Sequence, residues 1–232
     1  MNLIKGAIFD IDGTVLDSMP IWETVAGDYL VLNGIVPRDG LREELRTLGG
    51  RQVGEYFIKN YGINKTPEEI SDGIDKLLEG FYFDIAPPKP GVERVLQTLR
   101  DGGVPMCVAT ATDRHLVEAA LKRTGLLQYF GHIFTCLELR SGKDEPYIFL
   151  RAAESLGTGI AETCVFEDAL YAIRTAKKAG FPVVAVYDKS AKASADEIKA
   201  LADVYLNSFD EFFFPKKKDQ KGLCNDITLY WR

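Results

Sequence analysis

Short apolar runs recur along the chain and alternate with longer segments of helical period. The first run covers residues 7–9, and others follow at residues 104–110, 132–136, 163–167, 182–187 and 203–206. Amphipathic stretches lie between most of them, at residues 92–100, 114–124, 147–156 and 169–179. Apolar runs of this length indicate buried strands, and the amphipathic stretches indicate helices. Repeated strand–helix units predict a parallel sheet covered by helices on both faces.

Residues 20–83 break this alternation. They contain no strong strand pattern, and their periodicity predicts helices at residues 21–32, 41–48, 52–60 and 67–83. A proline-rich stretch at residues 86–91 suits a semi-rigid return link. We therefore predict an α/β protein whose core is a doubly wound, Rossmann-like, mostly parallel sheet. Residues 1–16 and 87–232 form that core, and residues 17–86 form an inserted helical cap that rocks over the sheet, a static decoration being the alternative.

Composition narrows the class of protein. The 232 residues are 46% hydrophobic and 27% charged, which is typical of a globular protein with a full core. The net charge of −6 argues against a nucleic-acid groove, and no apolar run is long enough to span a bilayer. The four cysteines are widely spaced, and the N-terminus carries no signal-peptide pattern. We expect a cytoplasmic monomer or weak dimer without membrane or nucleic-acid partners, and a solvated basic tail at residues 215–221.

The sequence Asp10-Ile11-Asp12-Gly13-Thr14 directly follows the first apolar run. Because strand side chains alternate between faces, Asp10 and Asp12 share one side of the strand end. Two crowded carboxylates favour a cation between them or a proton on one of them. An Asx-turn with solvated acids is the alternative for an isolated Asp-Gly turn.

Further residues with polar side chains or backbone groups follow other predicted strands, where parallel sheets bind their ligands. They are Thr110, Ala111 and Thr112 after one strand, Glu167 and Asp168 after another, and Lys143 in a loop before a helix. Clustered carboxylates favour Mg²⁺, and an ammonium group neutralises a phosphoryl oxygen. Each residue alone has an ordinary structural explanation, but their coincidence at one sheet edge predicts phosphoryl transfer.

The chain resembles a known group of enzymes through four motifs in order. Residues 10–18 match the first motif, residues 108–110 the second, Gly142-Lys143 with residues 146–149 the third, and residues 165–169 the fourth. These residues are similar to the motifs of the haloacid dehalogenase-like superfamily, in the branch with a helical cap after the first strand. Within it, the resemblance is to the β-phosphoglucomutase and small sugar-phosphate phosphatase group, and it extends to about residue 214.

The resemblance implies roles for the acids. Asp10 would be the nucleophile that forms an aspartyl phosphate. Asp12 would protonate the leaving alcohol and then activate water. Asp10, the backbone carbonyl of Asp12, and Asp168 would bind Mg²⁺, with Glu167 helping directly or through water. A bound cation keeps a nucleophilic carboxylate ionised, while the acid that faces the leaving group carries the proton.

The resemblance also implies a phosphate site. Thr110 and Lys143 would bind the transferring phosphoryl group, together with Asp10 and the backbone at Ala111. Lys143 would pair with Asp10 as well. The expected substrate is a small phosphorylated metabolite such as a sugar phosphate.

Several residues depart from the family pattern. Trp22 stands where the mutase has a catalytic histidine in its cap, which favours a phosphatase over a mutase. It is also a candidate substrate contact, which offers an apolar wall and no proton carrier. Asp144-Glu145 follow Lys143 where the family often has proline and a small residue, and they add negative charge near the site. In the cap, Arg51 is the candidate for a distal substrate contact because a guanidinium grips phosphate or sugar oxygens. A solvated helix-start arginine is the alternative.

We therefore expect a Mg²⁺-dependent phosphomonoester hydrolase that works through an aspartyl phosphate. The alternative within enzymes is a hexose-phosphate mutase. A phosphoacceptor signalling domain is a further alternative, since such domains also pair strand-end acids with a lysine on a doubly wound sheet.

Overall fold

The chain divides into two compact units. A computed structural model describes residues 2–45, 48, 50–212 and 228–229. One unit is Met1–Asp17 with Pro87–Arg232, and the other is Ser18–Ala86. Compactness does not test which unit carries the chemistry, so the assignment of residues 1–16 and 87–232 to a catalytic core and of 17–86 to a cap remains a prediction.

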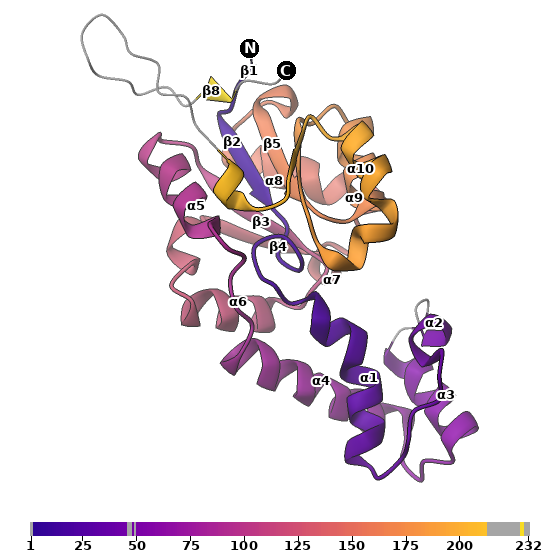
Figure 1. Cartoon of the computed structure of the whole chain (residues 1–232). Coiled ribbons are helices and arrows are strands. Elements are labelled where there is room, and N and C mark those ends of the chain that lie inside the picture. The colour runs from indigo at the N-terminus through magenta and orange to yellow at the C-terminus, as the bar shows by residue number, and fades with distance from the viewer. Residues whose placement is uncertain (1, 46–47, 49, 213–227, 230–232) are drawn as a thin grey trace, which may run out of the picture. The chain divides into compact units, whose positions relative to one another are not determined.

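A six-stranded parallel sheet forms the centre of the first unit (Figure 1). The strands are β2 (Gly6–Phe9), β3 (Met106–Thr110), β4 (His132–Thr135), β5 (Thr163–Glu167), β6 (Val183–Val186) and β7 (Val204–Leu206). Their order across the sheet is β4-β3-β2-β5-β6-β7. This order reverses between β2 and β5, which is the doubly wound arrangement with its ligand crevice at the switch point. The fold-class prediction is confirmed. A separate antiparallel pair joins β1 (Asn2–Leu3) to β8 (Thr228–Leu229).

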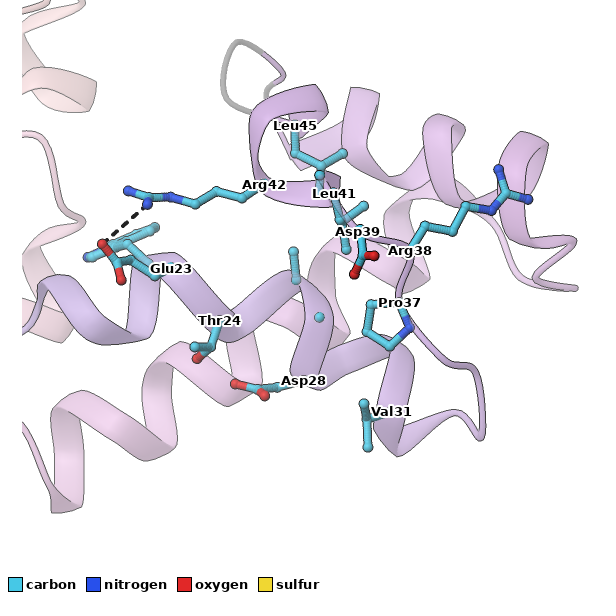
Figure 2. Close-up of a pocket in the computed structure, with 14 residues that line it drawn as sticks. Glu23, Thr24, Asp28, Val31, Pro37, Arg38, Asp39, Leu41, Arg42 and Leu45 are labelled. Carbon is cyan, nitrogen blue, oxygen red and sulfur yellow. Dashed lines mark ion pairs between the residues drawn. The ribbon is translucent and has the colours of Figure 1, made fainter. Parts of the chain in front are cut away.

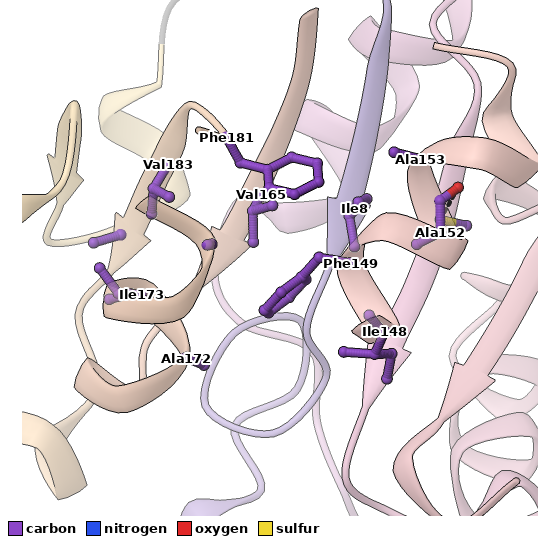
Figure 3. Packing of buried hydrophobic residues seen from close by; sticks show 14 of the residues in the cluster. Ile8, Ile148, Phe149, Ala152, Ala153, Val165, Ala172, Ile173, Phe181 and Val183 are labelled. Carbon is purple, nitrogen blue, oxygen red and sulfur yellow. Dashed lines mark hydrogen bonds between the residues drawn. The ribbon is translucent and has the colours of Figure 1, made fainter. Parts of the chain in front are cut away.

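Helices connect successive strands of this sheet. They are α5 (Val92–Asp101), α6 (Arg114–Arg123), α7 (Cys136–Leu139), α8 (Tyr147–Leu156), α9 (Leu170–Lys178) and α10 (Ala195–Leu201). Figure 3 shows Ile148 and Phe149 of α8 packed near Ile8 and Val165 of the central strands. This buried cluster covers one face of the sheet and includes small residues such as Ala152, which let helix and sheet approach closely.

Aromatic rings fill the other face. Strand alternation turns Phe9 and Phe166 away from Ile8 and Val165, and their rings stack with centroids 4.2 Å apart. The Phe166 ring also contacts those of Phe209 and Phe212, which follow β7. Helix α5 is joined to this segment because Arg94 donates hydrogen bonds to the backbone oxygens of both residues. Both faces of the sheet are therefore covered.

An ion cluster in the first unit joins the segments that lead to and from residues 18–86. The backbone N–H of Asp17 donates to the oxygen of Pro87 at 2.8 Å. The Lys89 ammonium lies 2.6 Å from Asp188 at the end of β6 and 3.4 Å from Asp17. Asp188 is almost fully buried and also accepts hydrogen bonds from Ser190. The cluster thus holds both segments to the sheet.

The second unit is helical. It contains α1 (Met19–Leu32), α2 (Leu41–Leu45), α3 (Gly50–Tyr61) and α4 (Pro67–Asp84), packed around a small core that includes Tyr29, Leu30, Phe57 and Ile70. Thr66 and Glu69 form a reciprocal capping box at the start of α4, and Pro67 occupies its first turn. This motif fixes where α4 begins.

Most predicted elements are present, with two corrections. The predicted helix 41–48 ends at Leu45, and Leu48 is not helical. The predicted strand 132–136 ends at Thr135, whose side chain caps α7 by accepting a hydrogen bond from the Glu138 N–H at 3.2 Å. Helices α7 and α10 were not predicted, because so few residues carry little periodic signal. The basic stretch 215–221 lies outside the described residues.

Two glycines of the second unit provide a test of its packing. A Cβ on Gly54 of α3 would lie 2.5 Å from the backbone oxygen of Pro67, whereas a Cβ on Gly80 of α4 would meet nothing within 4 Å. We expect Gly54→Ala to lower the free energy of unfolding by about 2 kcal/mol, since the backbone of α4 must shift. The matched Gly80→Ala variant should raise it by about 0.5–1 kcal/mol through helix propensity. Denaturant titration measures both, and equal effects would contradict this packing.

The Asp188 carboxylate predicts a pH dependence of stability. Burial alone would raise its pKa, but hydrogen bonds from Lys89 and Ser190 outweigh burial and lower the pKa of Asp188 below 3.8. A lowered folded-state pKa stabilises the fold above the unfolded pKa, and this contribution disappears as the pH falls through the folded value. The stability difference between wild type and Asp188→Asn should therefore be largest above about pH 5 and shrink toward pH 3. A difference that grows on acidification would contradict the assignment.

Candidate active site

The carboxyl ends of the central strands bring the predicted chemical groups together. In the sheet register, Phe9 of β2 is paired with Phe166 of β5 and with Val108 of β3. The residue after Phe9 is Asp10, whose N–H donates to the Phe166 oxygen at 3.0 Å. Asp10 therefore lies beside Glu167, the last residue of β5.

A tight turn follows Asp10. Gly13 has a φ of 84°, a conformation that favours glycine, and its N–H donates to the oxygen of Leu16. The N–H groups of Thr14, Val15 and Leu16 all point to the oxygen of Ile11. The turn explains why the sequence needs a glycine directly after Asp12.

Lys143 lies between two carboxylates. Its ammonium donates a hydrogen bond to Asp10 Oδ1 and lies 3.2 Å from Glu167 Oε1. All three side chains are buried. A buried ammonium group needs such partners, because desolvation would otherwise remove its charge. Burial disfavours the charged form of Lys143, but the charges of Asp10 and Glu167 outweigh burial and raise its pKa.

Three acids form a cluster with metal-binding geometry. One carboxylate oxygen each from Asp10, Glu167 and Asp168 lies within 4.8 Å of the others, and all three residues are buried. Hard oxygen ligands at this spacing suit Mg²⁺, which binds one or two carboxylates and retains other positions for water or phosphate oxygens. The donor set therefore fits a divalent cation.

The charges of the three acids also favour a bound divalent cation. Burial, followed by the charge of Asp10, raises the pKa of Glu167 and of Asp168 well above the ordinary values. Burial also raises the pKa of Asp10, against the opposing effect of Lys143. A single ammonium group does not balance three buried carboxylates. A divalent cation would balance them.

The other predicted site residues of the first unit lie in the turn after β2 and at the end of β3. Asp12 is half-buried, and its Oδ2 accepts a hydrogen bond from the Thr112 hydroxyl at 2.6 Å. Thr110 is fully buried at the end of β3, and its Oγ1 accepts from the Thr112 N–H at 3.1 Å. Ala111, between the two threonines, is exposed. The loop after β3 is thus bonded to the turn after β2.

Two hydroxyl residues contact the predicted acids, although the sequence indicated Thr112 only as a strand-end residue and Thr14 only as part of the first motif. Thr14 is fully buried and donates to Asp168 Oδ1 at 3.1 Å, across 154 positions of sequence. Thr112 bonds Asp12 as described above. Both lie in or beside the motifs, so their position was a signal, but the carboxylate that each one contacts was not visible in the sequence.

The predicted substrate residues Trp22 and Arg51 belong to the second unit. Arg51 is exposed and forms ion pairs with Glu55 at 3.2 Å and Glu68 at 2.6 Å. The Trp22 indole donates to the Tyr82 hydroxyl at 2.9 Å and lines a cavity of about 670 Å³ between α1 and α2. Figure 2 shows the pair of Glu23 and Arg42 at this cavity, 3.3 Å apart. The roles of Trp22 and Arg51 stay predictions.

The chain matches a known family of enzymes. The model of the haloacid dehalogenase-like hydrolases matches residues 4–180, which include both strand-end acid pairs and Lys143. The chain belongs to this hydrolase family. The predicted family and enzyme class are therefore confirmed.

Several relatives of this hydrolase match it over much of its length. The Bacillus subtilis (strain 168) protein YhcW is 30% identical over 188 residues, covering 81% of this chain and 85% of that protein. Fructose-1-phosphate phosphatase YqaB of Escherichia coli (strain K12) is 28% identical, covering 78% and 95%. Hexitol phosphatase A of the same strain is 26% identical, covering 92% and 95%.

Solved structures share its fold. CbbY from Rhodobacter sphaeroides, in complex with xylulose-1,5-bisphosphate, has a TM-score of 0.72 and 22% identity, covering 90% of this chain and 96% of that one. β-Phosphoglucomutase from Clostridium difficile has a TM-score of 0.66 and 18% identity, covering 91% and 94%.

Phosphoacceptor domains of the flavodoxin-like type have the strand order 2-1-3-4-5, so the observed order argues against that alternative. Across the described residues, every helix is too short or too polar to traverse a bilayer.

The acid cluster predicts stabilisation by a divalent cation. At about 100 times the dissociation constant, Mg²⁺ should raise the free energy of unfolding by about 2.7 kcal/mol, because it binds the folded state alone. Asp168→Asn should remove most of this gain. Thr14→Val should reduce it, since Thr14 orients Asp168. Thermal melts with and without Mg²⁺, at constant ionic strength, measure the effect.

The control is Asp101→Asn, which removes an acid at the end of α5 in the same unit. It should leave the gain intact. A gain of the same size in Asp168→Asn would place the cation elsewhere.

Proposed function

We propose that this hydrolase is a Mg²⁺-dependent phosphatase of small phosphorylated metabolites, with sugar phosphates as the substrate class. The observation that carries the proposal is the buried contact of Lys143 with Asp10 and Glu167, beside Asp168. This arrangement combines an activated carboxylate with positive charge for phosphoryl oxygens. The sugar-phosphate class is supported by the names of relatives such as fructose-1-phosphate phosphatase and hexitol phosphatase A.

The geometry of the acid cluster and the family match support the metal ligands of this proposal. Asp10, Glu167 and Asp168 would hold Mg²⁺ with the backbone carbonyl of Asp12. When bound, the cation supplies charge neutralisation for the phosphoryl oxygens and keeps Asp10 ionised. Lys143 supplies a second positive charge from the protein itself.

The chemistry then proceeds in two displacements. A carboxylate oxygen of Asp10 attacks phosphorus, the bond from phosphorus to the ester oxygen breaks, and Asp12 donates a proton to the departing alcohol. Asp12 then takes a proton from water, and the hydroxide attacks the aspartyl phosphate, which releases inorganic phosphate and regenerates Asp10. Thr110, the backbone N–H of Ala111, and Lys143 hold the phosphoryl oxygens.

The second unit supplies specificity in this proposal. Arg51 contacts a distal oxygen of the substrate. To do so, the Arg51 side chain leaves its ion pairs with Glu55 and Glu68. These pairs are exposed, so they contribute little free energy. Trp22 supplies an apolar wall without a titratable proton. We also propose that the protein works in the cytoplasm as a monomer or weak dimer.

The nucleophile assignment is tested by activity. A panel of phosphorylated metabolites is assayed for Mg²⁺-dependent release of inorganic phosphate. Asp10→Asn should lose at least about 10³-fold in kcat, because a neutral amide cannot attack phosphorus. It should remain folded, as judged by circular dichroism and its melting transition. Asp101→Asn, an acid removed far from the site, should keep wild-type activity.

Two outcomes would overturn the proposal. Undiminished turnover by Asp10→Asn would remove the nucleophile assignment. A β-hexose 1-phosphate that becomes the 6-phosphate faster than inorganic phosphate appears would establish the mutase alternative instead.

A further inference from the structure

Thr112 connects the loop after β3 to the acid after β2. Its side chain is almost fully buried, with 6% of the residue exposed. Its hydroxyl donates to Asp12 Oδ2 at 2.6 Å, across 100 positions of sequence. Its backbone N–H donates to Thr110 Oγ1 at 3.1 Å. One residue therefore contacts both the proposed acid–base and the proposed phosphate ligand.

A hydroxyl group is suited to a partner that changes its protonation state. It has one O–H donor and two acceptor lone pairs. An ionised Asp12 accepts a hydrogen bond from the Thr112 hydroxyl, whose oxygen lies 2.6 Å from Asp12 Oδ2. When Asp12 is protonated, the hydroxyl rotates and accepts from the carboxylic acid. The same pair of atoms stays bonded in both states, whereas an amide, an ammonium group or a methyl group at this position lacks this reversal.

The backbone contact has a separate consequence for Thr110. Because Thr110 Oγ1 accepts from the Thr112 N–H, one lone pair of that oxygen is used within the protein. The Thr110 hydroxyl still has its own proton to donate, and in the proposed function the acceptor is a phosphoryl oxygen. Thr112 thus contacts two groups of the proposed site, Asp12 and Thr110.

We propose that Thr112 is a positioning residue that holds Asp12 in one orientation through both half-reactions. The inference rests on the proposed function, since it concerns the proton transfers of a phosphatase. In the first half-reaction Asp12 loses a proton to the alcohol oxygen, and in the second it gains one from water. Thr112 exchanges no proton with the substrate and is not consumed.

The test compares Thr112→Val, which preserves shape without a hydroxyl, with Thr112→Ser, which keeps the hydroxyl. Two substrates differ in their need for an acid: a sugar phosphate has a poor leaving group, and p-nitrophenyl phosphate has a good one. Thr112→Val should lower kcat for the sugar phosphate by about 10²-fold, the lower end of general acid–base effects. KM should change by less than about threefold, because uniform binding is retained.

The good leaving group separates the two steps. Its departure needs no proton, so Thr112→Val should still form the aspartyl phosphate quickly from p-nitrophenyl phosphate. Hydrolysis of the aspartyl phosphate, which needs Asp12 to activate water, is then the slow step. A burst of nitrophenolate equal to the enzyme concentration should therefore precede a slow steady state. Thr112→Ser should restore most of the sugar-phosphate turnover and remove the burst. Thr124→Val, which deletes a hydroxyl at the end of α6, is the control and should match the wild type.

The outcomes separate the two proposals. Equal losses with both substrates and no burst, or failure of serine to restore activity in a folded variant, would overturn the role of Thr112 while leaving the phosphatase in place. Unchanged sugar-phosphate turnover by Thr112→Val would do the same. A wild-type protein without phosphatase activity on the panel would overturn the proposed function, and the inference with it.

Discussion

The site depends on one buried electrostatic contact, in which the Lys143 ammonium is shared by Asp10 and Glu167. Burial makes each of these charges costly alone, so the three groups require one another. With Asp168 included, three carboxylates lie close to one ammonium group, so the net charge of the cluster is negative. This imbalance explains why burial and mutual repulsion raise the pKa values of Glu167 and Asp168. It also explains why a divalent cation fits this group of acids.

Neutral hydroxyl groups complete the arrangement around these charges. Thr14 donates to Asp168, and Thr112 donates to Asp12. Each bond fixes the orientation of one carboxylate. A hydroxyl group orients a carboxylate without adding charge to a site whose net charge is already negative. Phe9 and Phe166 directly precede Asp10 and Glu167 in the sequence. Their stacked rings keep the ends of β2 and β5 in register.

Much of the fold could be predicted from periodicity. Strands such as β3 and β5 are continuous apolar runs because both faces of a parallel sheet are buried, and the helix of residues 147–156 was predicted to the residue. Periodicity failed where elements are short. Helix α7 has four residues and begins at Cys136, which was assigned to a strand. It ends at Leu139 and is followed by Arg140 in a left-handed conformation (φ 52°) that glycine usually adopts. Its start depends on the cap from Thr135 and not on an apolar pattern.

The sequence by itself determined which groups are present and at which strand ends they stand, because motif order and the rule of carboxyl-end sites need no side-chain placement. It therefore identified Asp10, Asp12, Lys143 and Asp168 as candidates, together with the hydrolase family. Only the tertiary structure decided which group contacts which. Lys143 contacts Glu167 as well as Asp10, and Thr112 contacts Asp12, because the crossover into α8 and the sheet register bring residues from distant segments within hydrogen-bond range. Such contacts depend on three-dimensional distances of a few ångströms, which residue types and spacing do not specify.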